Sequence, residues 1–69
     1  MPLVEVTLTE GRDEQQLRSL ISALTTATVE TISAPIESVR VVIREVPTTR
    51  WAAGDVTIAE RTALQKEES

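Results

Sequence analysis

A chain of 69 residues folds as one domain, and so short a domain buries too little apolar surface to be stable without further support. Small proteins obtain this support from disulfides, from a structural metal or from association with other chains. The sequence contains no cysteine and no histidine, so a disulfide is impossible and a metal would have to be bound by carboxylates alone. We therefore expect a single domain over residues 1–69 that is stabilised by oligomerisation.

The charge and hydropathy of the sequence argue against several classes of function. The formal net charge is -4, whereas nucleic acids and anionic membranes attract basic surfaces. No stretch approaches the roughly 20 apolar residues of a membrane span, and the first residues lack the basic segment and apolar core of a signal peptide. These features predict a cytoplasmic protein that binds neither nucleic acid nor a membrane.

The first half of the chain predicts a strand followed by a long helix. Apolar and polar residues alternate over residues 3–8, as in a half-buried strand. Asp13 and Gln16 have the spacing of a capping box, in which the aspartate accepts a free amide of the first helical turn. Residues 33–35, which include a proline, mark the end of the helix. Between these limits one apolar stripe recurs at spacings of three and four: Leu17, Leu20, Ile21, Leu24, Thr28 and Ile32.

A second strand is predicted at residues 39–46, which are rich in β-branched side chains and precede Pro47. A strand, a helix and a strand form a right-handed crossover unit with parallel strands. One helix covers only one face of such a sheet, so the face that includes Val42 needs a second subunit. Two units side by side would make a four-stranded sheet under two helices.

The expected fold is therefore α/β (α+β), with two parallel strands, one long helix and a short C-terminal hairpin. The hairpin arm is predicted within residues 51–58, around a turn at Gly54 and Asp55. Residues 65–69 are polar and are expected to form a frayed tail.

Pro2 stands out among the residues that could carry chemistry, because it directly precedes a strand. Methionine is normally removed when the next residue is this small, and Pro2 would then carry a free secondary amine. Burial beside cationic groups lowers the pKa of an amine and makes it a useful base near neutral pH. The alternative is that proline is simply a common second residue without a role.

Three arginines occur at the ends of expected elements, where the rim of a pocket could form: Arg12, Arg40 and Arg50. A guanidinium binds a carboxylate through two parallel hydrogen bonds, which suits a dicarboxylate or a keto acid. It would also depress the pKa of a nearby amine. The alternative is that the arginines are solvated or paired with acidic side chains close in sequence. These acids are Glu10, Glu45 and Asp55.

Trp51 is the only aromatic residue in the sequence. A lone tryptophan is often structural. Two locations are therefore considered for Trp51: a contact between subunits and the wall of a pocket. The chain has no cysteine or histidine and no Gly-rich phosphate loop, which excludes serine triads and zinc chemistry.

Several of these residues belong to one pattern that extends from Pro2 to residue 64. Its members are Pro2, Glu10-Gly11-Arg12, Asp13-Glu14-Gln15, Pro35, Ser38-Val39-Arg40-Val41, Trp51 and Gly54. Together they resemble the 4-oxalocrotonate tautomerase (2-hydroxymuconate tautomerase) family of the tautomerase superfamily. The most specific parts are the N-terminal proline, the Glu-Gly-Arg segment at the family spacing and the Val-Arg-Val strand.

The resemblance implies β-α-β units that pair into dimers and assemble as a hexamer, a trimer of dimers. It also implies an isomerase that interconverts enol and keto forms of unsaturated 2-oxo acids such as 2-hydroxymuconate, without cofactor or metal. Pro2 would take the proton of the 2-hydroxyl group and return it to a distant carbon. Arg12 would hold the remote carboxylate, and Arg40, often from an adjacent subunit, would engage the 2-oxo group and its carboxylate. Trp51 would form an apolar wall of the pocket.

Two departures from the family pattern leave the substrate open. Ala53 and the Gly54-Asp55 pair stand where the family has a bulky aliphatic residue and two glycines, so the pocket wall is expected to be wider and more acidic. A branch that hydrates haloacrylates has a water-activating glutamate at the position of Ala53, which argues against a dehalogenase.

The leading hypothesis is an isomerase of aromatic hydrocarbon catabolism that acts as a homo-oligomer or within a heterohexamer. Three alternatives remain: a tautomerase of a biosynthetic pathway, a non-catalytic partner subunit of a heterohexamer, and a small acidic interaction module.

Overall fold

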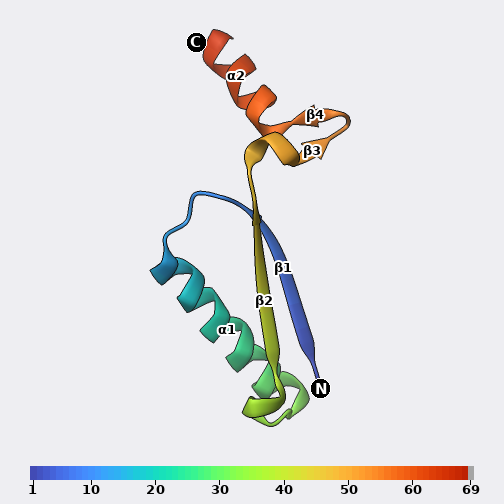
Figure 1. Ribbon diagram of the computed structural model, residues 1–69. Coiled ribbons are helices and arrows are strands. Elements are labelled where there is room, and N and C mark those ends of the chain that lie inside the picture. The colour runs from blue at the N-terminus through green and yellow to red at the C-terminus, as the bar shows by residue number, and fades with distance from the viewer. Residues whose placement is uncertain (69) are drawn as a thin grey trace.

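The computed structural model describes residues 1–68, and the side chains of residues 1–65. It contains a β-α-β unit followed by a hairpin and a second helix (Figure 1). The helices and strands are β1 (Leu3–Thr9), α1 (Glu14–Ile32), β2 (Arg40–Val46), β3 (Ala52–Ala53), β4 (Val56–Thr57) and α2 (Ile58–Glu68). Short 3-10 turns precede β2 and β3: η1 (Ile36–Ser38) and η2 (Thr48–Arg50). Neither helix, as far as the structure describes the chain, is long and apolar enough to cross a membrane.

The predicted crossover unit is confirmed. Strands β1 and β2 are parallel neighbours, in a register that pairs Leu3 with Arg40 and Thr9 with Val46. Helix α1 connects them and lies along one side of the two-stranded sheet (Figure 1). The ladder is continued at its far end, where the amide of Glu10 donates to the carbonyl of Val46 (2.9 Å).

Helix α1 begins and ends as the sequence predicts. The Asp13 carboxylate accepts from the amide of Gln16 (2.7 Å), and the Gln16 side chain accepts from the amide of Asp13 (3.1 Å), which completes the capping box. Ser33 ends the helix in the left-handed conformation, with a φ of 57°. Ile32 departs from the predicted stripe, because it lies in the last turn of α1 and is 59% exposed within one chain.

A single chain has almost no core. Among the side chains that the structure describes, Leu17 alone is buried, at 8% exposure. The radius of gyration is 16.3 Å, whereas a compact chain of this length would have about 11 Å. Hydrophobic burial is the main favourable contribution to folding, so a chain with so little of it depends on contacts with other chains.

The side of the sheet opposite α1 is uncovered, as predicted. We call it the uncovered sheet face. Its exposed side chains are Leu3, Glu5 and Thr7 from β1, and Arg40, Val42 and Arg44 from β2. Leu3 is 57% exposed and Val42 is 39% exposed, so apolar surface lies open on this face.

The predicted hairpin is confirmed, and its turn follows from two residues. Strands β3 and β4 are antiparallel, and Ala53 pairs with Val56 across the two-residue loop. Gly54 and Asp55 in that loop have φ values of 59° and 65°, as the tight hairpin turn of this length requires. The hairpin and α2 extend beyond the end of the β-α-β unit (Figure 1).

Helix α2 was not predicted from the sequence. The expected frayed tail of residues 65–69 instead continues this helix as far as Glu68, and Ser69 lies outside the described residues. A signal for the helix start was present: Thr57 and Glu60 form a second capping box. The Glu60 carboxylate accepts from the amide of Thr57 (2.9 Å), and the Thr57 hydroxyl accepts from the amide of Glu60 (3.0 Å).

The start of α2 is expected to loosen in acid. The amide of Thr57, and secondarily its hydroxyl, lower the pKa of Glu60 by hydrogen bonding to the ionised carboxylate. A lowered pKa in the folded state means that this contribution is complete above the ordinary carboxylate pKa and is lost as the pH falls through the lowered value. Amide exchange at residues 58–61 should therefore accelerate in acid beyond its intrinsic pH dependence. In Glu60→Gln, which keeps an acceptor but does not titrate, this excess should be absent, and an equal excess in the variant would contradict the assignment.

Candidate active site

Pro2 and Arg40 lie side by side at the start of the two parallel strands. The amide of Arg40 donates to the carbonyl of Pro2 (3.0 Å), directly before the first pair of the ladder. Pro2 is half-buried, and Arg40 belongs to the uncovered sheet face. The parallel pairing of β1 and β2 thus brings Pro2, which can supply an amine, and Arg40, which carries a guanidinium, to the same end of the sheet.

The guanidinium groups of Arg12 and Arg40 are held in the same way. In each, Nη1 donates to the backbone carbonyl three residues earlier: that of Thr9 for Arg12 (2.8 Å) and that of Glu37 for Arg40 (2.8 Å). One bond orients the planar group and leaves its other N–H donors for a ligand, since a guanidinium carries five. Both side chains are exposed, so an anion can reach them.

These two carbonyl anchors were not recognised from the sequence. The η1 turn presents the carbonyl of Glu37 and is itself fixed by the Ser38 hydroxyl, which donates to the carbonyl of Pro35 (2.7 Å). The signal available in the sequence was the position of Arg40, three residues after Glu37 of the η1 turn, which lets its guanidinium reach the Glu37 carbonyl. Between described side chains, no salt bridge involves Arg12, Arg40 or Arg50, so the alternative of pairing with nearby acids is not observed.

Arg12 and Trp51 lie at the opposite end of the sheet from Pro2. Strand β1 has seven residues, which at about 3.3 Å each separates its two ends by roughly 20 Å. Arg12 follows the end of β1, and Trp51 follows η2, with Arg50 as the last residue of that turn. Trp51 is 38% exposed, and its carbonyl accepts from the amide of Ile58 (2.9 Å). One chain therefore carries two groups of candidate residues at opposite ends.

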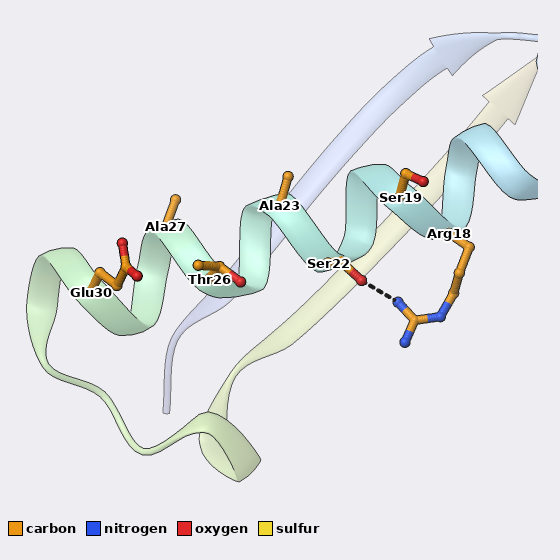
Figure 2. A pocket seen from close by; sticks show the side chains of 7 residues that line it. All are labelled: Arg18, Ser19, Ser22, Ala23, Thr26, Ala27 and Glu30. Atoms are coloured by element: carbon orange, nitrogen blue, oxygen red, sulfur yellow. Dashed lines mark hydrogen bonds between the residues drawn. The ribbon is translucent and has the colours of Figure 1, made fainter.

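One hollow on the surface of the chain contains none of these residues. It is an open groove along the outer side of α1, shown in Figure 2. The lining residues are mostly small: Arg18, Ser19, Ser22, Ala23, Thr26, Ala27 and Glu30. Arg18 Nη1 donates to Ser22 Oγ there (2.9 Å). The groove is open to solvent and its one carboxylate, Glu30, is exposed, so we do not assign the chemistry to it. Among the described side chains, those of residues 1–65, no three potential metal ligands are grouped together.

Comparison with known families and curated proteins agrees with this arrangement. The family model described as tautomerase enzyme matches residues 2–61. A relative named "probable tautomerase" from Ralstonia nicotianae is 52% identical, over 81% of this chain and 80% of its own. The 2-hydroxymuconate tautomerase of Comamonas testosteroni is 38% identical, over 87% of this chain and 95% of its own.

Solved structures give the same fold. TomN, a 4-oxalocrotonate tautomerase homologue of the tomaymycin biosynthetic pathway, is 48% identical and superimposes with a TM-score of 0.87, over 90% of this chain and 95% of its own. A heterohexamer 4-oxalocrotonate tautomerase from Chloroflexus aurantiacus is 38% identical, with a TM-score of 0.83 over 87% and 97% of the two chains.

The β-α-β unit with its long helix and small C-terminal hairpin is the tautomerase fold. The chain belongs to the 4-oxalocrotonate tautomerase family of the tautomerase superfamily, and it is a tautomerase-type isomerase.

Proposed function

We propose that this protein catalyses enol–keto proton transfer on unsaturated 2-oxo acids of the 2-hydroxymuconate type, with Pro2 as general base and then general acid. The observation that carries the proposal is the position of Pro2, hydrogen-bonded through its carbonyl to Arg40 at the first step of a parallel sheet. In the translated chain the nitrogen of Pro2 belongs to a peptide bond with Met1. Removal of Met1 converts it into a secondary amine, which can accept a proton.

The proton transfer requires no change in oxidation state. The Pro2 nitrogen takes the proton of the 2-hydroxyl group, and the electron pair left on oxygen forms the carbonyl while the double bonds shift along the chain. The resulting ammonium then returns the proton to a distant carbon. The neighbouring cations disfavour the protonated amine and so favour a base that is free at neutral pH.

The arginines and Trp51 have complementary roles in this proposal. Arg40 binds the 2-oxo group and its carboxylate, and Arg12 binds the carboxylate at the other end of a diacid, where it draws electron density along the conjugated chain. Both are suited to this by the backbone anchor that orients each guanidinium. Trp51 contributes an apolar wall, which helps to keep the amine of Pro2 neutral.

The site is complete only in an oligomer. Pro2 and Arg12 of one chain are separated by the length of β1, far more than a six-carbon diacid spans. We propose a hexamer built as a trimer of dimers, in which Pro2 of one chain meets Arg12 of another. The small residues along the outer side of α1 suit close packing against a helix of a second copy.

A second substrate class is favoured by a separate observation. Identity is 48% to TomN, from a biosynthetic pathway, and 38% to the 2-hydroxymuconate tautomerase of Comamonas testosteroni. Ala53 and Asp55 in the hairpin also make a wider and more acidic wall than the family pattern. A substrate without the second carboxylate, from a biosynthetic route, is therefore the competing proposal.

A comparison of two substrates tests these proposals. Mass spectrometry first establishes that Met1 is absent, and ketonisation is then followed by ultraviolet absorbance for 2-hydroxymuconate and for 2-hydroxy-2,4-pentadienoate, which lacks the second carboxylate. Preference for the diacid, lost in Arg12→Ala, is the result we expect. Equal turnover of both substrates would favour the biosynthetic alternative.

Turnover of neither substrate would favour the third possibility, a partner subunit of a heterohexamer. Such a subunit would show activity only after mixing with its companion chain. The presence of Pro2, Arg12 and Arg40 in one sequence argues against a non-catalytic role.

A further inference from the structure

The η1 turn is closed by hydrogen bonds from the backbone and from one side chain. The amide of Ser38 donates to the carbonyl of Pro35 (2.9 Å), and the amide of Val39 donates to the carbonyl of Ile36 (3.2 Å). The Ser38 hydroxyl donates to the same Pro35 carbonyl over a shorter distance (2.7 Å). Pro35 has a φ of -60°, the value that its ring imposes. The turn is therefore held at its start by a rigid residue and at its end by two donors of Ser38.

This turn determines where the guanidinium of Arg40 lies. Arg40 Nη1 donates to the carbonyl of Glu37, the central residue of η1 (2.8 Å). The backbone of Arg40 is fixed separately, because its amide donates to the carbonyl of Pro2 (3.0 Å). An exposed arginine otherwise samples many rotamers, and ordering them on binding costs free energy. The sheet and the turn together restrict the Arg40 side chain at both of its ends before a substrate binds.

The carbonyl that anchors Arg12 is supported differently. It belongs to Thr9, the last residue of β1, which is paired with Val46 in the sheet ladder. The Glu37 carbonyl lies outside the sheet, in a 3-10 turn of three residues. Such turns have poorer hydrogen-bond geometry than helices or sheets and gain more from an additional bond. The hydroxyl of Ser38 supplies this bond next to the Glu37 carbonyl.

We propose that Ser38 is a positioning residue for Arg40. By fixing η1, its hydroxyl keeps the Glu37 carbonyl where it orients the guanidinium toward the 2-oxo group and carboxylate of a substrate. Donors that are oriented in advance stabilise charge that develops on the 2-oxo oxygen without reorganising during the reaction. Ser38 acts through Arg40 and does not itself touch the substrate. The inference rests on the substrate-binding role proposed above for Arg40.

The first test uses two substrates and two replacements of Ser38. Ser38→Ala should lower kcat/KM by roughly 10-fold, the effect of losing one hydrogen bond that orients a reacting group. The loss should be equal for 2-hydroxymuconate and 2-hydroxy-2,4-pentadienoate, because Arg40 binds the part that both share. Ser38→Thr keeps the hydroxyl and should retain most of the activity. Ultraviolet absorbance measures both substrates.

A double-mutant cycle distinguishes positioning of Arg40 from general support of the fold. In an Arg40→Ala background, Ser38→Ala should lower the residual activity no further, whereas a merely structural hydroxyl would lower it by the same factor in both backgrounds. Ser22→Ala is the matched control. It removes a serine hydroxyl that accepts from Arg18 (2.9 Å), an arginine outside the proposed site, and should behave like the unmodified protein.

A measurement without substrate completes the test. Rotation about the Nε–Cζ bond of Arg40 is followed by NMR of protein that contains isotope-labelled arginine, with the signal assigned from its absence in Arg40→Lys. The bond to the Glu37 carbonyl slows this rotation. Ser38→Ala should accelerate the rotation of Arg40 several-fold and leave that of Arg12 unchanged, since Arg12 has its own anchor.

Unchanged rotation of Arg40 in Ser38→Ala would overturn the proposal, and so would equal losses of activity in the two backgrounds of the cycle. The rotation is measured in the free protein. If neither substrate is turned over, it still decides whether Ser38 positions Arg40, and the failure then refutes the proposed substrates alone.

Discussion

Replacement of Pro2 by alanine is expected to lower kcat for ketonisation by roughly 100-fold or more, the contribution typical of a positioned general base. Alanine leaves a primary amine at the terminus, which is more mobile than the ring nitrogen of proline and differs from it in basicity. The amide of Arg40 would still find the carbonyl of residue 2, so the sheet should form as before. Steady-state kinetics by ultraviolet absorbance and a circular dichroism spectrum of the variant measure the two effects.

A protein with an N-terminal extension is the control for this experiment. The extension keeps the ring of Pro2 but converts its nitrogen into an amide, which has no useful basicity. Activity should be lost in the extended protein and should return when the extension is removed to expose Pro2. An extended protein as active as the native one would show that the nitrogen of Pro2 is not the base, and Arg12 and Arg40 would then serve another mechanism.

The β-α-β unit could be predicted because local patterns determine it. Alternation over residues 3–8, the capping box at Asp13 and the β-branched run before Pro47 each specify one element, and the handedness of crossovers fixes their arrangement. Helix α2 was missed because its apolar residues are few and its surroundings are polar. The capping box of Thr57 and Glu60 was a better signal than hydropathy in that segment.

The spatial relations of the site were harder to predict. The sequence identified Pro2, Arg12 and Arg40 as candidates, but their separation depends on the direction and register of β1 against β2. Parallel pairing of Leu3 with Arg40 brings Arg40 to Pro2 and leaves Arg12 at the far end. The ion pair between Arg44 Nη1 of β2 and Glu5 Oε2 of β1 (2.7 Å) depends on the same register, because a shift by one residue would place Arg44 on the opposite face of the sheet.

The small amount of apolar surface that a single chain buries and the separation of its candidate site residues into two groups have one cause. A chain of 69 residues that keeps a long sheet and a long helix spreads its apolar side chains over surfaces that only other copies can cover. The same elongation places Pro2 and Arg12 at opposite ends of β1. Assembly would therefore bury the apolar surface and complete the active site in one step.

Mixed oligomers test this division directly. Pro2→Ala and Arg12→Ala should each be nearly inactive alone. If every site takes Pro2 from one chain and Arg12 from another, random mixing of equal amounts leaves both residues intact in about a quarter of the sites. Co-expression of the two variants should therefore restore about a quarter of the activity of the unmodified protein, measured as turnover per site.

A second mixture distinguishes the shared site from a site within one chain. The unmodified protein is combined with an equal amount of the double variant Pro2→Ala/Arg12→Ala. Shared sites again predict about a quarter of the activity, because the two residues are drawn independently from intact and altered chains. Sites within one chain predict about half, and they also predict no recovery when the two single variants are mixed. That pair of results would contradict the separation of Pro2 and Arg12 along β1 as the basis of the assembly.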